Sequence, residues 1–174
     1  MDIRDQLLVE HSKQNTLAIA GYIGNNSERF SVLMDLFFND PNKSRVVQRA
    51  AHVLSFCLDK HPDLITPHLE ALIHNLKEDN VHVAVRRNTV RALQTITIPE
   101  ELLGDTWNIC FTYLSSAEEP IAVKAFSMTV LYNICKKLPE LKEELQIVIE
   151  DQLPYGSSGF KNRAHKVLKG LTKL

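Results

Sequence analysis

The sequence predicts an all-α fold, a right-handed α-α superhelix of about four to five helical hairpins. Prolines and polar clusters divide the 174 residues into segments of ~10 to 20 residues, in which apolar positions recur every three or four residues. No segment alternates with the period of two that a strand requires. The pattern itself recurs about every 38 residues, and hairpins of this length must stack on neighbours to bury their apolar faces.

The first helix of each hairpin is expected to follow a proline or a polar cluster. Pro62, Pro99 and Pro139 precede three of these segments, and an Asn25-Asn26-Ser27 cluster precedes another. Such residues favour turns and the ends of helices over helix interiors. The predicted first helices are 2–11, 27–38, 63–78, 100–115 and 140–153.

The second helix of each hairpin is expected after a short turn that ends in an acidic or amide residue, and it opens on a Val-x-x-small pattern. The predicted second helices are 13–24, 42–60, 81–98, 120–138 and 159–172. Together the ten helices make a single domain over 1–174. Its repeat units are about 1–25, 26–60, 62–98, 99–138 and 139–174.

The core positions of the second helices share one register. A step of 38 residues joins apolar or small residues in three or four successive repeats. These sets are Val47, Val85 and Val123; Leu54, Ala92, Val130 and Leu168; Leu58, Ile96 and Ile134; and Ala51, Thr89 and Ser127. The repeat therefore lies in the residues that are expected to be buried.

Two stretches, 40–54 and 79–93, resemble the second helix of HEAT repeats. Each begins with a turn acid, Asp40 or Asp79, and carries an early arginine. In that family the turn acid and the arginine help to tie adjacent repeats together. The resemblance covers nearly the whole chain and implies the architecture rather than an activity. The following repeat departs from the pattern, with Glu119 and Lys124 in place of the Asp and the Arg.

Composition and charge narrow the class of protein. With 20 Lys and Arg against 21 Asp and Glu, the net charge of -1 gives no general attraction to nucleic acid or to a membrane. Charges among the first apolar residues argue against a signal peptide, so a cytoplasmic location is expected. Cys57, Cys110 and Cys135 lie in apolar helical contexts and are predicted to be buried free thiols.

Basic residues recur at two adjacent positions of the repeat and would form a stripe along the second helices. One position holds Gln14, Arg49, Arg87 and Arg163, and the position before it holds Lys13, Gln48, Arg86 and Lys124. The favoured interpretation is structural, with Asp40 pairing with Arg49, Asp79 with Arg86 or Arg87, and Glu119 with Lys124. The alternative is a groove for an acidic ligand.

A partner-binding face is predicted from the cations that these pairs leave over. They are Arg45, Arg91 and whichever of Arg86 and Arg87 stays unpaired, and His52, Asn88, Gln94, Met128 and Tyr132 are their expected neighbours. Arginine, tyrosine and methionine are enriched in protein interfaces. The candidate partner-binding residues are Arg45, Arg49, Arg86, Arg87, Arg91, Lys124, Met128 and Tyr132.

The predicted function is a non-enzymatic scaffold that binds a protein or peptide on the second helices. The sequence contains no metal-binding, phosphate-binding or nucleophile motif, so no cofactor, metal site or catalytic residue is assigned. Nucleic-acid binding is the alternative, because HEAT-like solenoids include glycosylases that excise alkylated purines from DNA. A remoter alternative is a lyase, because Gly156–Asn162 resembles the serine-rich loop of the adenylosuccinate lyase superfamily.

Overall fold

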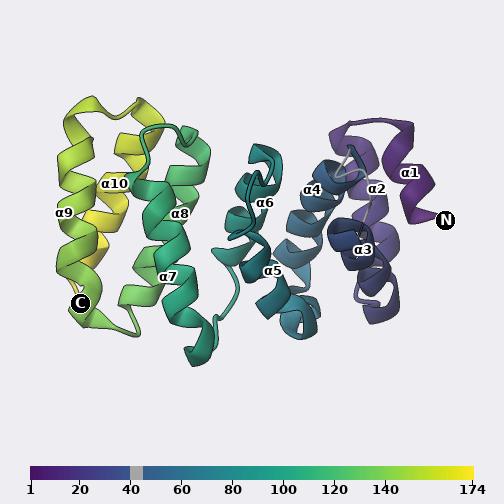
Figure 1. The fold of residues 1–174 in the computed structure, drawn as a ribbon, viewed down its shortest axis with the longest axis horizontal. Helices are drawn as coiled ribbons and strands as arrows, with labels where there is room; N and C mark the ends of the chain where they lie inside the picture. Colours follow the sequence, from purple (N-terminus) through teal and green to yellow (C-terminus); the bar gives the residue numbers. More distant parts are fainter. Residues whose placement is uncertain (40–44) are drawn as a thin grey trace. The chain divides into compact units, whose positions relative to one another are not determined.

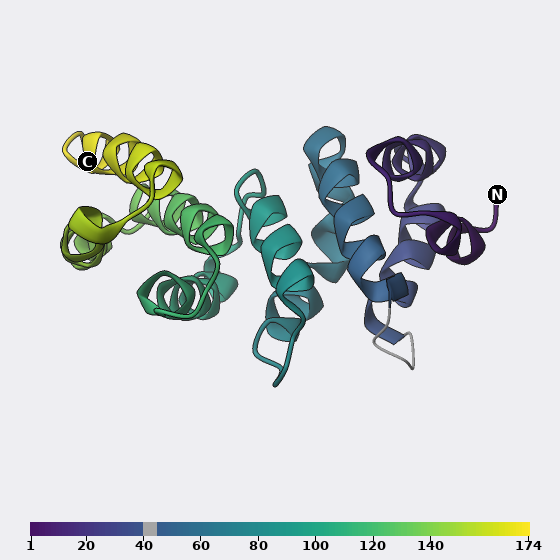
Figure 2. The ribbon, with the colours of Figure 1, turned by 90° about the horizontal axis from the view of Figure 1, so that it is seen from above.

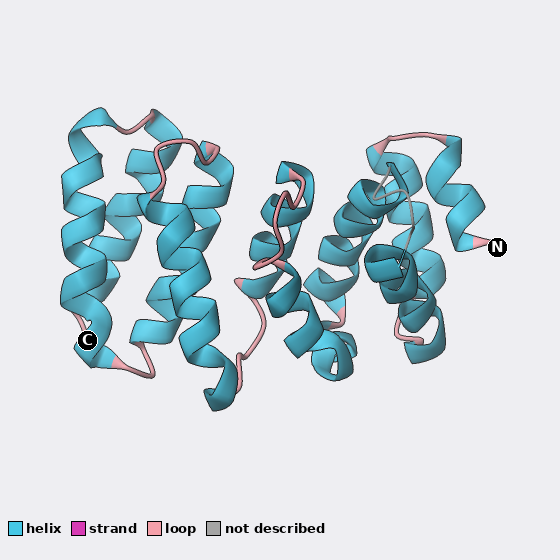
Figure 3. Cartoon of the chain, viewed as in Figure 1, coloured by secondary structure: helices cyan, strands magenta, loops and turns pink. Residues whose placement is uncertain are grey.

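The computed structural model describes residues 1–39 and 45–174, and in these residues it contains helices and no strand (Figures 1 and 3). The all-α, helical-hairpin fold class is therefore confirmed. The chain divides into two compact units, 1–96 and 97–174, which are described separately. The single domain over 1–174 remains a prediction.

The described residues of unit 1 form six α-helices and one 3-10 helix. They are α1 (Ile3–Val9), α2 (Lys13–Ile23), α3 (Ser27–Asn39), α4 (Arg45–Lys60), η1 (Pro62–His68), α5 (Leu69–Asn75) and α6 (Val83–Leu93). Helix α4 is central, because it packs against α2, α3 and α6. Its apolar residues are accordingly buried, with Leu54 wholly inaccessible to solvent.

Unit 2 contains four α-helices and two short 3-10 turns. They are α7 (Glu100–Ser115), α8 (Ile121–Cys135), η2 (Pro139–Leu141), α9 (Lys142–Gln152), η3 (Leu153–Tyr155) and α10 (Ser158–Leu171). Helix α8 packs against α7 and α10. Seen from above, the second helices α8 and α10 form one layer and the first helices α7 and α9 form the other (Figure 2).

The ten predicted helices are all present, and the differences lie at their ends. The predicted helix 81–98 ends at Leu93, because the β-branched run from Thr95 to Ile98 precedes Pro99, which disfavours helical geometry in the residue before it. The predicted helix 63–78 begins as the 3-10 helix η1, which contains Pro67. Proline lacks the backbone N–H that an α-helix needs at this position. Of the predicted helix 42–60, residues 42–44 lie outside the described chain.

The predicted core register is confirmed at most of its positions on the second helices, but two of its members, Val47 and Ile96, are only half-buried. Leu54, Ala92 and Val130 are each at most 1% exposed. The small residues of the same register, Ala51, Thr89 and Ser127, are fully buried; they are small enough to let neighbouring helices approach closely. The last member of the series, Leu168, is only half-buried.

Candidate functional site

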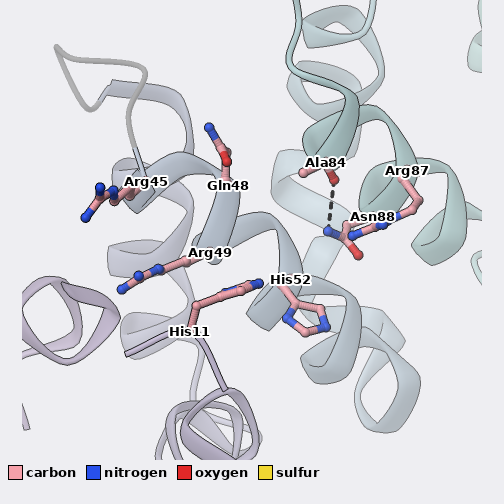
Figure 4. A pocket seen from close by; sticks show the side chains of 8 residues that line it. All are labelled: His11, Arg45, Gln48, Arg49, His52, Ala84, Arg87 and Asn88. Atoms are coloured by element: carbon pink, nitrogen blue, oxygen red, sulfur yellow. Dashed lines mark hydrogen bonds between the residues drawn. The ribbon is translucent and has the colours of Figure 1, made fainter. Parts of the chain in front are cut away.

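A pocket of about 200 Å³ opens on the second helices of unit 1 (Figure 4). Its lining residues are His11, Arg45, Gln48, Arg49, His52, Ala84, Arg87 and Asn88. The α4 residues follow a spacing of i, i+3, i+4 and i+7, and the α6 residues follow i, i+3 and i+4. Residues at these spacings share one face of a helix, so two neighbouring repeats present corresponding faces to the same pocket.

The pocket is strongly cationic, because its described lining residues include three arginines and no carboxylate. Arg49 is half-buried, and its Nη1 donates a hydrogen bond of 2.5 Å to the backbone carbonyl of Leu7 on α1. Arg45 and Arg87 are exposed, and neither makes a hydrogen bond or ion pair with another described residue. They project from α4 and α6 on opposite sides of the pocket (Figure 4). Two of the three guanidinium groups are therefore available to a ligand.

His52 lies between these arginines and is held by contacts with α2 and α4. Its Nδ1 lies 3.3 Å from Oγ1 of Thr16, and its ring packs edge-on against Phe56 at 5.2 Å between centroids. Burial lowers the pKa of His52, and the charges of His11, Arg87 and Arg91 lower it further. At neutral pH it is therefore a neutral polar group beside two free cations.

Arg91, predicted to be a surplus cation, has partners on the preceding second helix, so that prediction was wrong. Its Nη2 forms a salt bridge of 2.5 Å with Asp59, and its Nη1 donates to the hydroxyl of Ser55 at 2.6 Å. The guanidinium also lies over the ring of Phe56, 5.0 Å from its centroid. Arg91 lies one helical turn beyond Arg87, where α4 presents an acid instead of another cation.

Arg86 and Lys124 act as ties within their own repeats. Arg86 donates to the carbonyl of Val81 in the turn that precedes α6. Lys124 donates to the carbonyl of Ser116 at 2.9 Å, which replaces the expected pairing with Glu119. Because turn carbonyls lack helical partners, such cations satisfy groups that burial would otherwise leave without a hydrogen bond. The expected pairing of Asp40 with Arg49 involves a residue outside the described chain.

Comparison with protein families matches residues 3–171 to the HEAT repeat domain. The chain belongs to the HEAT repeat family. HEAT repeat domains commonly mediate protein interactions. No curated protein matches the chain, and no solved structure does.

In this HEAT repeat protein, Met128 and Tyr132 lie in unit 2, whereas the described lining residues of the arginine pocket belong to unit 1. Met128 is fully buried, so the prediction of an exposed methionine on the partner-binding face was wrong. Tyr132 is half-buried beneath Lys136, whose Nζ lies 4.5 Å from the ring centroid. A Cβ at Gly170 would lie 2.6 Å from the Tyr132 hydroxyl, so the tyrosine fills the space above α10.

His52 and Asn88 were predicted beside the arginines and Gln48 on the basic stripe, whereas the lining residues His11 and Ala84 were not predicted. Ala84 could have been found from the helical spacing of Arg87 and Asn88 on α6. His11 lies before α2, and nothing in the local sequence places it at this pocket.

The segment that resembles a lyase loop has a structural role in this HEAT repeat protein. The hydroxyl of Ser157 caps α10 by accepting a hydrogen bond of 3.3 Å from the backbone N–H of Phe160. Gly156 leaves room for the Phe160 ring, because a Cβ there would lie 2.6 Å from it. The glycine and the serine are thus explained by a helix start and by close packing.

The three cysteines are free and buried, as predicted. Burial raises the pKa of Cys57 and Cys110 to about 12 and that of Cys135 to about 11. Their thiols therefore stay protonated near neutral pH, and a protonated thiol is a poor nucleophile.

Within residues 1–39 and 45–174, no group of three His, Cys, Asp or Glu side chains is placed to hold a metal. No helix in the same residues is long and apolar enough to cross a membrane.

Proposed function

We propose that this HEAT repeat protein is a non-enzymatic scaffold that binds a segment of a partner protein on α4 and α6. The observation that carries the proposal is the pair Arg45 and Arg87, which flank a pocket and make no hydrogen bond or ion pair with any described residue. Exposed arginines of this kind are free to pair with an incoming anion, and arginine is enriched at protein-binding hot spots. Because neighbouring repeats supply them, the pocket depends on the stacking that defines the family.

Nucleic-acid binding is the second candidate, and the absence of carboxylates among the lining residues favours it. The net charge of -1 and the neutralised Arg91 weigh against it, since a duplex needs a continuous row of cations along its phosphates.

We retain the cytoplasm as the proposed compartment. Three free, buried cysteines are typical of a reducing environment.

A pull-down compares the wild type with the variant R45E/R87E and with the control K166E/K169E. The control makes the same change of charge on exposed lysines of α10. Cytoplasmic extract treated with nuclease is passed over each protein at low and at high salt, and the retained proteins are identified. Proteins held by the wild type and the control but lost from R45E/R87E support the scaffold.

Two outcomes would contradict this function. Retention of the same proteins by all three forms places binding elsewhere on the chain. Retention of nucleic acid from untreated extract, with no protein retained, favours the nucleic-acid alternative.

A further inference from the structure

We infer that the pocket on α4 and α6 binds an acidic protein segment, whose carboxylate side chains pair with Arg45 and Arg87. This inference rests on the proposed function and names the chemistry of the partner. It begins from the charge of the pocket, where Arg45, Arg49 and Arg87 meet no carboxylate among the lining residues that the structure describes. An anion that enters would relieve the repulsion among these cations and form charge-assisted hydrogen bonds with them.

The neighbouring turn of the same helix pair shows what such a pairing looks like. There Arg91 of α6 reaches across to α4 and binds Asp59, and the hydroxyl of Ser55 accepts a second bond. One turn earlier, Arg87 of α6 faces Gln48 and His52 of α4 instead. Asp59 supplies the carboxylate at the first position, and no described residue of the pocket supplies one at the second. A carboxylate of a partner would complete the second position by the same chemistry.

The size of the pocket favours side chains over a cofactor. Small-molecule sites usually enclose ~300–1,000 Å³. This pocket encloses about 200 Å³, which accommodates one or two side chains while the rest of the segment stays outside. Arg45 and Arg87 lie on opposite sides of it (Figure 4), so a segment that crosses from α4 to α6 would reach both. At least two carboxylates, separated along the segment, fit this arrangement.

The short extent of free positive charge favours a peptide over a nucleic acid. Along α6, the cation that follows Arg87 on the same face is Arg91, which Asp59 already neutralises. Arg49 is engaged by the carbonyl of Leu7, so the free charge is confined to Arg45 and Arg87. Phosphates repeat along a duplex at short intervals, and two cations neutralise only a small part of them. Two cations are enough to pair with the carboxylates of a short acidic segment.

The test selects short random peptides displayed on phage against the full chain. We expect the selected peptides to be enriched in Asp and Glu. Synthetic copies should bind about tenfold more weakly to R45Q/R87Q, because charge-assisted bonds to two arginines are lost, and more weakly in high salt. They should bind K166Q/K169Q as they bind the wild type. A labelled DNA duplex of mixed sequence is measured in parallel.

Several results would overturn the inference. Selected peptides without acidic enrichment whose binding is still lost in R45Q/R87Q would leave the scaffold at this face intact and reject the acidic segment. Acidic peptides that bind R45Q/R87Q and K166Q/K169Q equally well would show that their binding site lies outside the pocket. Tighter binding of the DNA duplex than of the peptides would assign the pocket to nucleic acid. Failure to select any peptide would count against both the inference and the proposed function.

Discussion

The second helices of unit 1 and unit 2 use their cations differently. In unit 2, Lys124 on α8 donates to the carbonyl of Ser116, and Arg163 on α10 donates to the hydroxyl of Thr129. In unit 1, Arg45 on α4 and Arg87 on α6 have no such partner among the described residues. These cations of unit 2 are therefore engaged, whereas unit 1 contains engaged cations, such as Arg49 and Arg91, together with two that have no partner among the described residues.

The difference depends on what lies within reach of each side chain. Lys124 passes over apolar surface near Phe160 to a turn carbonyl, and burial lowers its pKa. Arg87 instead meets a face that carries Gln48, Arg49 and His52, none of which is an anion at neutral pH. A basic residue at a repeated position is thus a structural tie only where its own repeat or the adjacent one offers an acceptor.

The largest expected effect comes from matched core truncations, one in each unit. Leu54→Ala on α4 and Leu131→Ala on α8 each remove a fully buried side chain and should cost about 2–5 kcal/mol of unfolding free energy. Cys57 reports on unit 1, and Cys110 and the single tryptophan, Trp107, report on unit 2. Thiol labelling at rising denaturant should expose Cys57 early in Leu54→Ala and Cys110 early in Leu131→Ala. Equal changes at both thiols in either variant would show that the two units unfold together.

A smaller effect should separate the tied arginine from the free one. Arg91→Gln loses the bonds to Asp59 and Ser55 and should cost about 1 kcal/mol, because the ion pair is about one-third exposed and solvent screens it. Arg87→Gln should change stability by less than about 0.5 kcal/mol. Urea unfolding of both variants measures these changes in unfolding free energy. A double-mutant cycle that combines Arg91→Gln with Asp59→Asn isolates the contribution of the Arg91–Asp59 ion pair. Equal losses in the two variants would contradict the distinction between tied and free cations.

The smallest expected effect is the pH dependence that His52 contributes. Its pKa in the folded chain lies below the ordinary histidine value of 6.5, so below that pH the unfolded chain binds more protons than the folded one. Stability should therefore fall as the pH drops from about 6.5 toward the folded pKa, and this part of the loss should vanish in His52→Gln. Arg87→Gln removes one of the charges that lower the pKa, so NMR titration of the His52 ring should show a higher pKa in that variant. An unchanged or lower pKa would contradict the placement of Arg87 beside His52.

The sequence by itself determined the helices and the buried register. Helical periodicity and proline positions act over a few residues, so the predicted 100–115 coincides with α7, and Leu54, Ala92 and Val130 are buried as predicted. It also identified the arginines of the pocket, because Arg45, Arg49 and Arg87 recur on the predicted second helices. These properties are local or repeat along the chain.

Only the tertiary structure decided which cations are engaged. Arg91 meets Asp59 across 32 residues, and Arg49 meets the carbonyl of Leu7 across 42. Such contacts depend on how far one helix is rotated and shifted against the next, and a single turn separates the paired Arg91 from the free Arg87. The periodicity of one helix fixes its own faces but carries no information about that rotation. For the same reason Met128, predicted to be exposed, is buried on α8.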